Sequence, residues 1–122
     1  MGLTALVCFA RPAVAGEMVT LHVQLTGGQL YDMCVDKPGD ETQILDNHIC
    51  AGYLSGAQDA VDMMTLYLKG TPEYCVPGDT KRGVLLNIFR DYVATHPGAR
   101  ERPGAAVMVI AYRDAFPCPK AK

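Results

Sequence analysis

Residues 45–68, LDNHICAGYLSGAQDAVDMMTLYL, form the longest periodic stretch of the chain. Apolar residues recur in it at steps of three and four, the spacing of one face of an α-helix. The predicted apolar face consists of Leu45, Ile49, Tyr53, Ala57, Ala60, Val61, Met64 and Leu68. Asp46 is a candidate cap at its start, and Lys69, Gly70 and Pro72 form a stop signal after it. The stretch therefore predicts a long amphipathic helix against which other elements can pack.

Shorter helices are predicted before and after this stretch. Leu30 to Cys34 form the first, which Pro38-Gly39 cannot continue, so residues 36–42 form a polar loop. Asp79 or Thr80 is expected to cap the helix that follows the long one, and His96-Pro97-Gly98 to end it. The buried stripe of this helix is predicted to be Leu85, Ile88, Phe89, Tyr92 and Val93, with Lys81, Arg82, Arg90 and Asp91 facing water.

The last apolar segment runs from Gly104 to Phe116, after Pro103 and before Pro117. Its run AAVMVIA, residues 105–111, is apolar on all sides, so the segment is either a central strand or a buried helix. Its length, its alanines, the proline at its start and the lack of partner strands favour the helix. The predicted fold is therefore all-α, a small bundle of about four helices.

The composition is that of one ordinary globular domain. Of the 122 residues, 49% are hydrophobic and 20% are charged, which excludes the polar profile of disordered chains. The formal net charge of -2 provides no cationic surface for phosphates. We therefore expect no nucleic-acid partner, and a basic protein partner is mildly favoured.

The N-terminus carries the features of an export signal. An apolar stretch from Leu3 to Ala10 leads to Ala13-Val14-Ala15, an A-x-A cleavage pattern, so residues 1–15 are predicted to be a signal peptide. The alternative is a short buried N-terminal segment. No other apolar run approaches the roughly 20 residues that span a bilayer. We therefore expect an exported mature protein that has no membrane contact once the signal is removed.

Residues 16–27 follow the signal as a separate segment. Val19, Leu21, Val23 and Leu25 alternate with polar residues, which is the period of a half-buried strand. A lone strand has no sheet to join, so we expect an extended N-terminal arm that lies on the helices or pairs with another molecule. The glycine pair at 27 and 28 is predicted to break this arm, and residues 28–119 to form the domain.

Four cysteines remain after the signal and Cys8 are removed: Cys34, Cys50, Cys75 and Cys118. An even number of cysteines in a small exported chain predicts a disulfide framework, in which four cysteines permit three pairings. Antiparallel packing of four helices puts the end of the first near the start of the second, and the start of the third near the end of the fourth. This arrangement favours the pairs Cys34–Cys50 and Cys75–Cys118.

No catalytic or metal-binding set is visible in the sequence. The mature cysteines are expected to be oxidised, and His22, His48 and His96 lie on separate predicted elements. A zinc site needs ligands at close spacing, and the chain has no Cys-x-x-Cys pair. We therefore predict a protein that is not an enzyme, has no cofactor or metal, and works by binding another protein.

Several short motifs, taken in order, resemble the Rap/Tai family of type VI secretion immunity proteins. They are LYDMC at 30–34, ICAGYLSGAQD at 49–59, CVP at 75–77, YVATHP at 92–97 and FPC at 116–118. Besides the cysteines, the positions that match the family pattern are Gly52, Tyr53, Gly56, Asp59, Pro77, His96, Pro97, Phe116 and Pro117. The resemblance covers most of the mature chain from Gly28 onward, although Ile49 stands where an aromatic residue is expected.

The resemblance implies an all-α, disulfide-bonded periplasmic protein, often a homodimer. It implies that the protein binds a secreted peptidoglycan amidase and plugs its catalytic groove, which protects the producing cell. The fold is also similar to that of the small Hde-type acid-stress chaperones. The alternative function is therefore a periplasmic stress or chaperone-like protein that exposes apolar surface when its carboxylates are protonated.

Single motif residues have structural and functional interpretations. Gly52 and Gly56 lie one turn apart, and close packing against the alanines of the last helix is favoured over a binding groove. Tyr53 is expected in the core with its hydroxyl at the edge, where Asp59 is one candidate partner. His48 is interpreted as solvated and His96 as a favourable charge at a helix C-terminus. The loops 36–43, 70–79 and 97–102 are the candidate contact surfaces.

Overall fold

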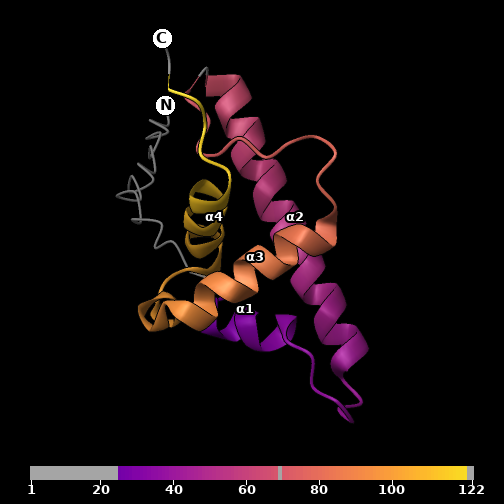
Figure 1. Cartoon of the computed structure of the whole chain (residues 1–122). Helices are drawn as coiled ribbons and strands as arrows, with labels where there is room; N and C mark the ends of the chain where they lie inside the picture. Colours follow the sequence, from indigo (N-terminus) through magenta and orange to yellow (C-terminus); the bar gives the residue numbers. More distant parts are fainter. Residues whose placement is uncertain (1–24, 69, 121–122) are drawn as a thin grey trace, which may run out of the picture.

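The computed structural model describes residues 25–68 and 70–120. Within these ranges the chain forms four α-helices, one short 3-10 helix and no strand (Figure 1). They are α1 (Gly27–Cys34), α2 (Gln43–Leu68), α3 (Arg82–Thr95), η1 (Pro97–Glu101) and α4 (Gly104–Ala115). The all-α prediction is confirmed. The predicted signal peptide and nearly all of the predicted arm lie outside the described residues.

The core lies where α1 meets the other helices, since α1 contacts α2, α3, η1 and α4. The buried apolar residues are Leu30, Cys34, Cys50, Leu54, Tyr74, Leu85, Phe89, Val93, Ala99, Val107, Met108, Ala111 and Tyr112. The predicted stripe of α3 is confirmed at Leu85, Phe89 and Val93, while Ile88 and Tyr92 are half-buried. All the helices therefore contribute to the core, which surrounds α1, the shortest of the four α-helices.

The long helix α2 buries a narrower face than predicted. Cys50 and Leu54 are buried, and Tyr53, Ala57 and Val61 are half-buried. The prediction was wrong at Leu45, Ile49, Ala60, Met64 and Leu68, which are exposed. Leu45, Met64 and Leu68 lie towards the ends of α2, whose 26 residues extend past helices of only 8, 14 and 12 residues. Ile49 and Ala60 are exposed for another reason, since each is about 100° around the helix axis from the buried Cys50 or the half-buried Val61.

The start of α1 differs from the sequence prediction. The two glycines at 27 and 28 were expected to break the chain, but they form the first turn of α1. Thr26 caps the helix, and its side chain and that of Gln29 form a reciprocal capping box. A Cβ atom at Gly27 would overlap the carbonyl oxygen of Ala99, so only glycine permits this close approach.

The described end of the N-terminal arm is bound to the start of α4. The amide of Gly104 donates to the carbonyl of Leu25 at 2.9 Å, and that of Gly27 donates to the carbonyl of Arg102 at 2.7 Å. Thr26 and Pro103 form an isolated antiparallel bridge between these two bonds. Residues 25 and 26 are therefore extended and lie on the helices.

Two helix starts and the burial of the last helix also differ from the prediction. Asp46 is not the cap of α2, which begins three residues earlier at Gln43. Neither Asp79 nor Thr80 caps α3, because Lys81 occupies the N-cap without a side-chain hydrogen bond. The fourth helix is confirmed, with Pro103 at its N-cap, but it is not buried on all sides, since Ala106 is exposed.

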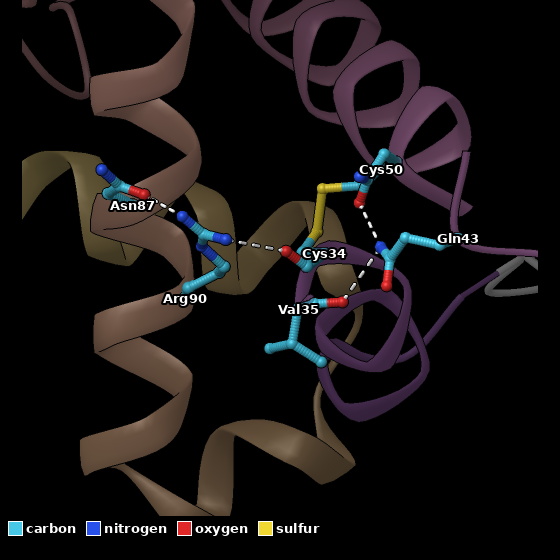
Figure 2. Close-up of a disulfide and its surroundings, with 7 residues drawn as sticks. Cys34, Val35, Gln43, Cys50, Asn87 and Arg90 are labelled. Carbon is cyan, nitrogen blue, oxygen red and sulfur yellow. Dashed lines mark hydrogen bonds between the residues drawn. A yellow bond between two sulfur atoms is a disulfide. The ribbon is translucent and has the colours of Figure 1, made fainter. Parts of the chain in front are cut away.

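Arg90 was predicted to face water, yet its guanidinium reaches from α3 to the end of α1 (Figure 2). Its Nη1 donates to the carbonyl oxygen of Cys34 at 3.2 Å, and its Nη2 donates to Asn87. The carbonyls of the last turn of a helix have no partner within the helix, and a cation there also interacts well with the helix dipole. Arg90 therefore ties α3 to the C-terminus of α1.

The two predicted disulfides are both confirmed. Cys34–Cys50 joins the last residue of α1 to α2, and Cys75–Cys118 joins the α2–α3 loop to the segment after α4. They close loops of 16 and 43 residues, worth about 3 and 4 kcal/mol if they act by restricting the unfolded chain. The disulfides thus fix both ends of the packing between α2 and the rest of the domain.

We predict opposite effects for two glycine-to-alanine substitutions. Gly52→Ala should raise the free energy of unfolding by about 0.5–1 kcal/mol, because Gly52 lies inside α2 and no described atom is within 4 Å of an added Cβ. Gly27→Ala should lower it by about 1–3 kcal/mol, because the new methyl group overlaps Ala99. Urea unfolding measures both, and a loss of stability in Gly52→Ala would contradict the open environment of this site.

Candidate functional site

A groove of about 640 Å³ lies between the C-terminal half of α2 and α4. Its walls are mostly apolar, and the side chains on the facing helices are Val61, Met64, Thr65 and Leu68 from α2 and Ala106, Val109, Ile110 and Arg113 from α4. Met64 and Leu68 are 60% and 73% exposed. This volume falls within the usual range for binding pockets, and methionine adapts well to partners of varied shape. We call this feature the α2–α4 groove.

The rim of the α2–α4 groove is formed by the loop after α2, which contributes Gly70, Thr71 and Glu73. The disulfide Cys75–Cys118 and a hydrogen bond of 2.9 Å from the Cys75 amide to the Phe116 carbonyl hold this loop against the end of α4. An exposed ion pair of 3.9 Å between Arg113 and Glu73 crosses the rim. The groove is therefore held in shape by covalent and backbone contacts, which lowers the entropy cost of binding.

Tyr74 lies in this loop and is buried against α4. Its ring meets that of Tyr112 edge to face, with centroids 5.5 Å apart. Its hydroxyl oxygen is buried and has no hydrogen-bond partner among the described residues. Burial, followed by the negative charge of Asp62, raises the pKa of Tyr74 well above its ordinary value of 10.0. Burial alone raises the pKa of Tyr112 to about 12.

A second, smaller hollow of about 350 Å³ lies between the end of α3, η1 and α4. His96 and Pro97 line it, and the imidazole of His96 stacks on Tyr92 with centroids 4.0 Å apart. Nδ1 of His96 lies 2.9 Å from the Tyr92 carbonyl, so it can donate to the last turn of α3. The interpretation of His96 as a residue of the helix C-terminus is confirmed, since it forms the C-cap of α3.

The residues that match the family pattern do not gather at one site. Gly52, Gly56 and Asp59 are exposed on α2, Pro77 and Pro117 are exposed in loops, and Tyr53 and Phe116 are half-buried against the core. Close packing of Gly52 and Gly56 against α4 was predicted and is wrong, because no described atom lies within 4 Å of a Cβ built on either. None of these residues lines the α2–α4 groove.

The structure places the three loops proposed as contact surfaces in different environments. The loop at 70–79 contributes to the α2–α4 groove, as described above. The segment 97–102 forms η1 and packs on α1, where Arg100 pairs with Asp32 at 2.9 Å and lies over the Tyr31 ring. The loop at 36–43 is held by internal bonds, including one of 2.8 Å from the Thr42 amide to Asp40, which lowers the pKa of that carboxyl.

The cysteines and histidines of the described residues do not come together in one place. All four of their cysteines are in disulfides, and His48 and His96 lie on different elements. Between residues 25 and 120, leaving out 69, no group of three or more His, Cys, Asp or Glu side chains could hold a metal ion. In the same part of the chain no helix has the length and hydropathy of a membrane span.

A family model described as Rap1a immunity proteins matches residues 26–118. The chain belongs to the Rap1a immunity protein family. This match covers all the described helices and both disulfides, and it confirms the resemblance drawn from the sequence motifs. Searches of the curated proteins and of the solved structures found no match.

Members of an immunity family act by binding a protein effector, and this Rap1a chain has its main groove away from the family motif. Sequence reasoning missed Met64, Leu68, Ile110 and Arg113 as surface residues of a groove. One signal was available, because Met63, Met64, Leu66, Tyr67 and Leu68 spread apolar side chains over more than one face of the last turns of α2. A helix with that pattern needs a partner on more than one face.

We predict that Tyr74→Phe leaves the free energy of unfolding at pH 7 unchanged or raises it by up to about 1 kcal/mol, because the variant removes a buried hydroxyl that has no partner. A loss greater than about 1 kcal/mol would show instead that Asp62 accepts this proton. The wild-type protein should lose stability as the pH rises above 10, where Tyr74 ionises in the unfolded chain but not in the folded one. Tyr74→Phe should lose less stability than the wild type as the pH rises above 10. Urea unfolding at a series of pH values measures the difference.

Proposed function

We propose that this protein is an exported immunity protein that binds a peptidoglycan amidase effector of type VI secretion in the periplasm and occludes its catalytic cleft. The observation that carries the proposal is the match to Rap1a immunity proteins over residues 26–118. Binding of the effector would protect the producing cell from the toxin of its siblings. In this role the chain needs no catalytic group and no cofactor.

The disulfides support the periplasmic part of the proposal. Both link separate elements of the fold, and such bonds persist in oxidising compartments and are rare where thiols are kept reduced. The predicted signal peptide at 1–15 supports the same compartment, because an apolar stretch followed by an A-x-A cleavage site is typical of an exported chain. Oxidation in the periplasm would then complete the fold.

The α2–α4 groove is the surface that we assign to the effector. Its exposed Met64 and Leu68 are large apolar side chains that gain from burial, and Arg113 at the rim can pair with a carboxylate of the partner. A specific interface buries about 800 Å² on each partner, so the end of α2 and the loop at 70–79 would take part as well. Bound there, the domain is large enough to cover a cleft.

The proposal predicts that an exported peptidoglycan amidase is encoded beside the gene. The test is a titration of the oxidised protein against that amidase, read both as heat of binding and as loss of peptidoglycan hydrolysis. We predict tight binding, inhibition at a ratio of one to one, and a weakening of at least about tenfold in Met64→Glu, which places a charge in the groove. Met64 is 60% exposed, so the fold should tolerate this change.

Ile44→Glu is the matched control, because Ile44 is also exposed and apolar on α2 but lies in its first turn, far from the groove. This variant should bind and inhibit like the wild type. Equal losses of affinity in Met64→Glu and Ile44→Glu would contradict the assignment of the groove to the effector. A wild type that does not bind the amidase would contradict the amidase as the partner.

A chaperone-like role is the second candidate, because the same exposed side chains of α2 could hold unfolded clients. This role predicts that the chain suppresses aggregation of several unrelated proteins, most strongly in acid. An immunity protein should instead bind its one effector and leave such clients unprotected at pH 4 as at pH 7.

A further inference from the structure

The smaller hollow between the end of α3, η1 and α4 is a second candidate for binding, and we call it the α3–α4 hollow. Its volume is about 350 Å³, at the lower end of the range of ligand pockets. Ile110 is the one described residue that it shares with the α2–α4 groove. The α3–α4 hollow therefore suits a small ligand rather than a helix or a loop of the effector.

One of the motifs noted in the sequence lines the α3–α4 hollow. Tyr92, Thr95, His96 and Pro97 belong to the run YVATHP at 92–97, and all four lie on its wall. Three of them, all but the tyrosine, are exposed, so packing in the core does not account for them. None of the four lines the α2–α4 groove. This motif is therefore available for a function that the groove does not serve.

Arg102 supplies a positive charge to the α3–α4 hollow. Its side chain is exposed and belongs to none of the ion pairs among the described residues. Its backbone is held on both sides, because its amide donates to the carbonyl of Ala99 at 3.2 Å and its carbonyl accepts from the amide of Gly27 at 2.7 Å. A guanidinium on a fixed backbone is suited to a carboxylate, which it binds through two parallel hydrogen bonds.

His96 supplies a hydrogen-bond acceptor to the same hollow. Its ring is held by stacking on Tyr92, with centroids 4.0 Å apart, and its Nδ1 lies 2.9 Å from the Tyr92 carbonyl oxygen. A carbonyl oxygen only accepts hydrogen bonds, so we assign the ring proton to Nδ1. In the neutral imidazole Nε2 then carries a lone pair and can accept a hydrogen bond from an N–H group.

The remaining wall of the α3–α4 hollow is apolar. Ala99 and Val107 line it and are buried, and Ile110 is half-buried beside them. An apolar side chain of a ligand gains free energy when it covers these residues. The ligand that fits the whole hollow therefore combines a carboxylate, an N–H group and an apolar side chain.

We propose that the α3–α4 hollow binds the C-terminal residue of a peptide. The terminal carboxylate pairs with Arg102, and the amide N–H of the same residue donates to Nε2 of His96. The side chain of that residue lies against Val107 and Ile110. Recognition of a chain end through its carboxylate is a recurring mode of peptide binding. This proposal goes beyond the immunity function and does not depend on the effector.

The first test is an NMR titration of the oxidised, isotope-labelled protein with N-acetyl-Ala-Leu, compared with the C-terminal amide of the same dipeptide. The acid should bind with a dissociation constant on the order of 1 mM or tighter and should shift the resonances of His96 and Arg102 most. The amide should bind at least about tenfold more weakly, because it lacks the charged partner of the guanidinium. An acid that shifts neither residue at about 10 mM, or that binds no better than the amide, would overturn the proposal.

The second test removes the positive charge. Arg102→Gln should weaken binding of the acid at least about tenfold and leave binding of the amide unchanged. Arg82→Gln is the matched control, because Arg82 is also exposed and in none of the ion pairs among the described residues, but lies at the start of α3. This control should bind the acid like the wild type. Equal effects of the two variants would overturn the assignment of the carboxylate to Arg102.

The third test separates two sources of the chain end, short peptides and proteins. The sequence Ala-Leu is offered either as the free dipeptide or at the C-terminus of a folded carrier protein. Binding of both supports the proposal and includes the ends of proteins among the ligands. Binding of the dipeptide alone supports it for short peptides. A carrier that binds equally well to the wild type and to Arg102→Gln would contradict recognition through the terminal carboxylate.

Discussion

The 26 residues of α2 rise about 39 Å, whereas the helices packed against it have 8, 14 and 12 residues and are at most about half as long. Short helices cannot cover a helix of this length, so apolar side chains remain exposed at both of its ends. In Figure 1, α2 accordingly runs along one side of the molecule and extends past the end of α4. The disulfide at Cys50 and the loop fixed by Cys75 hold α2 in this position, so the chain cannot rearrange to cover it.

The difference in length between α2 and the helices packed on it separates the residues that stabilise the fold from those available for binding. The core gathers around α1, where Leu30 and Cys34 are buried and Arg90 binds the last turn. The exposed apolar residues lie mainly on α2, where Met64 and Leu68 line the α2–α4 groove. Substitutions of these two residues should change binding with little effect on folding, because their exposed side chains contribute little to the core. This separation suits a protein whose function is to bind a partner.

The sequence predicted the helices and the disulfides because their signals are local or follow from short connections. Periodicity found α2, Pro103 marked the start of α4, and antiparallel packing selected Cys34–Cys50. The exposure of Met64 and Leu68 could not be predicted in the same way, because periodicity shows where apolar residues lie and not how far neighbouring helices extend. The role of Gly27 in α1 was missed for a related reason, since it depends on Ala99, which is distant in sequence. The family motif predicted the family, but its residues lie outside the groove, and besides the cysteines only Tyr53 and Phe116 of them pack against the core.

Oxidation of neighbouring methionines by hydrogen peroxide, followed by mass spectrometry, tests the central claim most directly. Met64 lines the α2–α4 groove, Met63 is exposed outside it, and the buried Met108 serves as an internal reference. The account predicts that the effector slows oxidation of Met64 more than that of Met63, and that Met108 stays unreactive with and without the effector. An effector complex in which Met64 keeps the oxidation rate of the free protein would contradict the account.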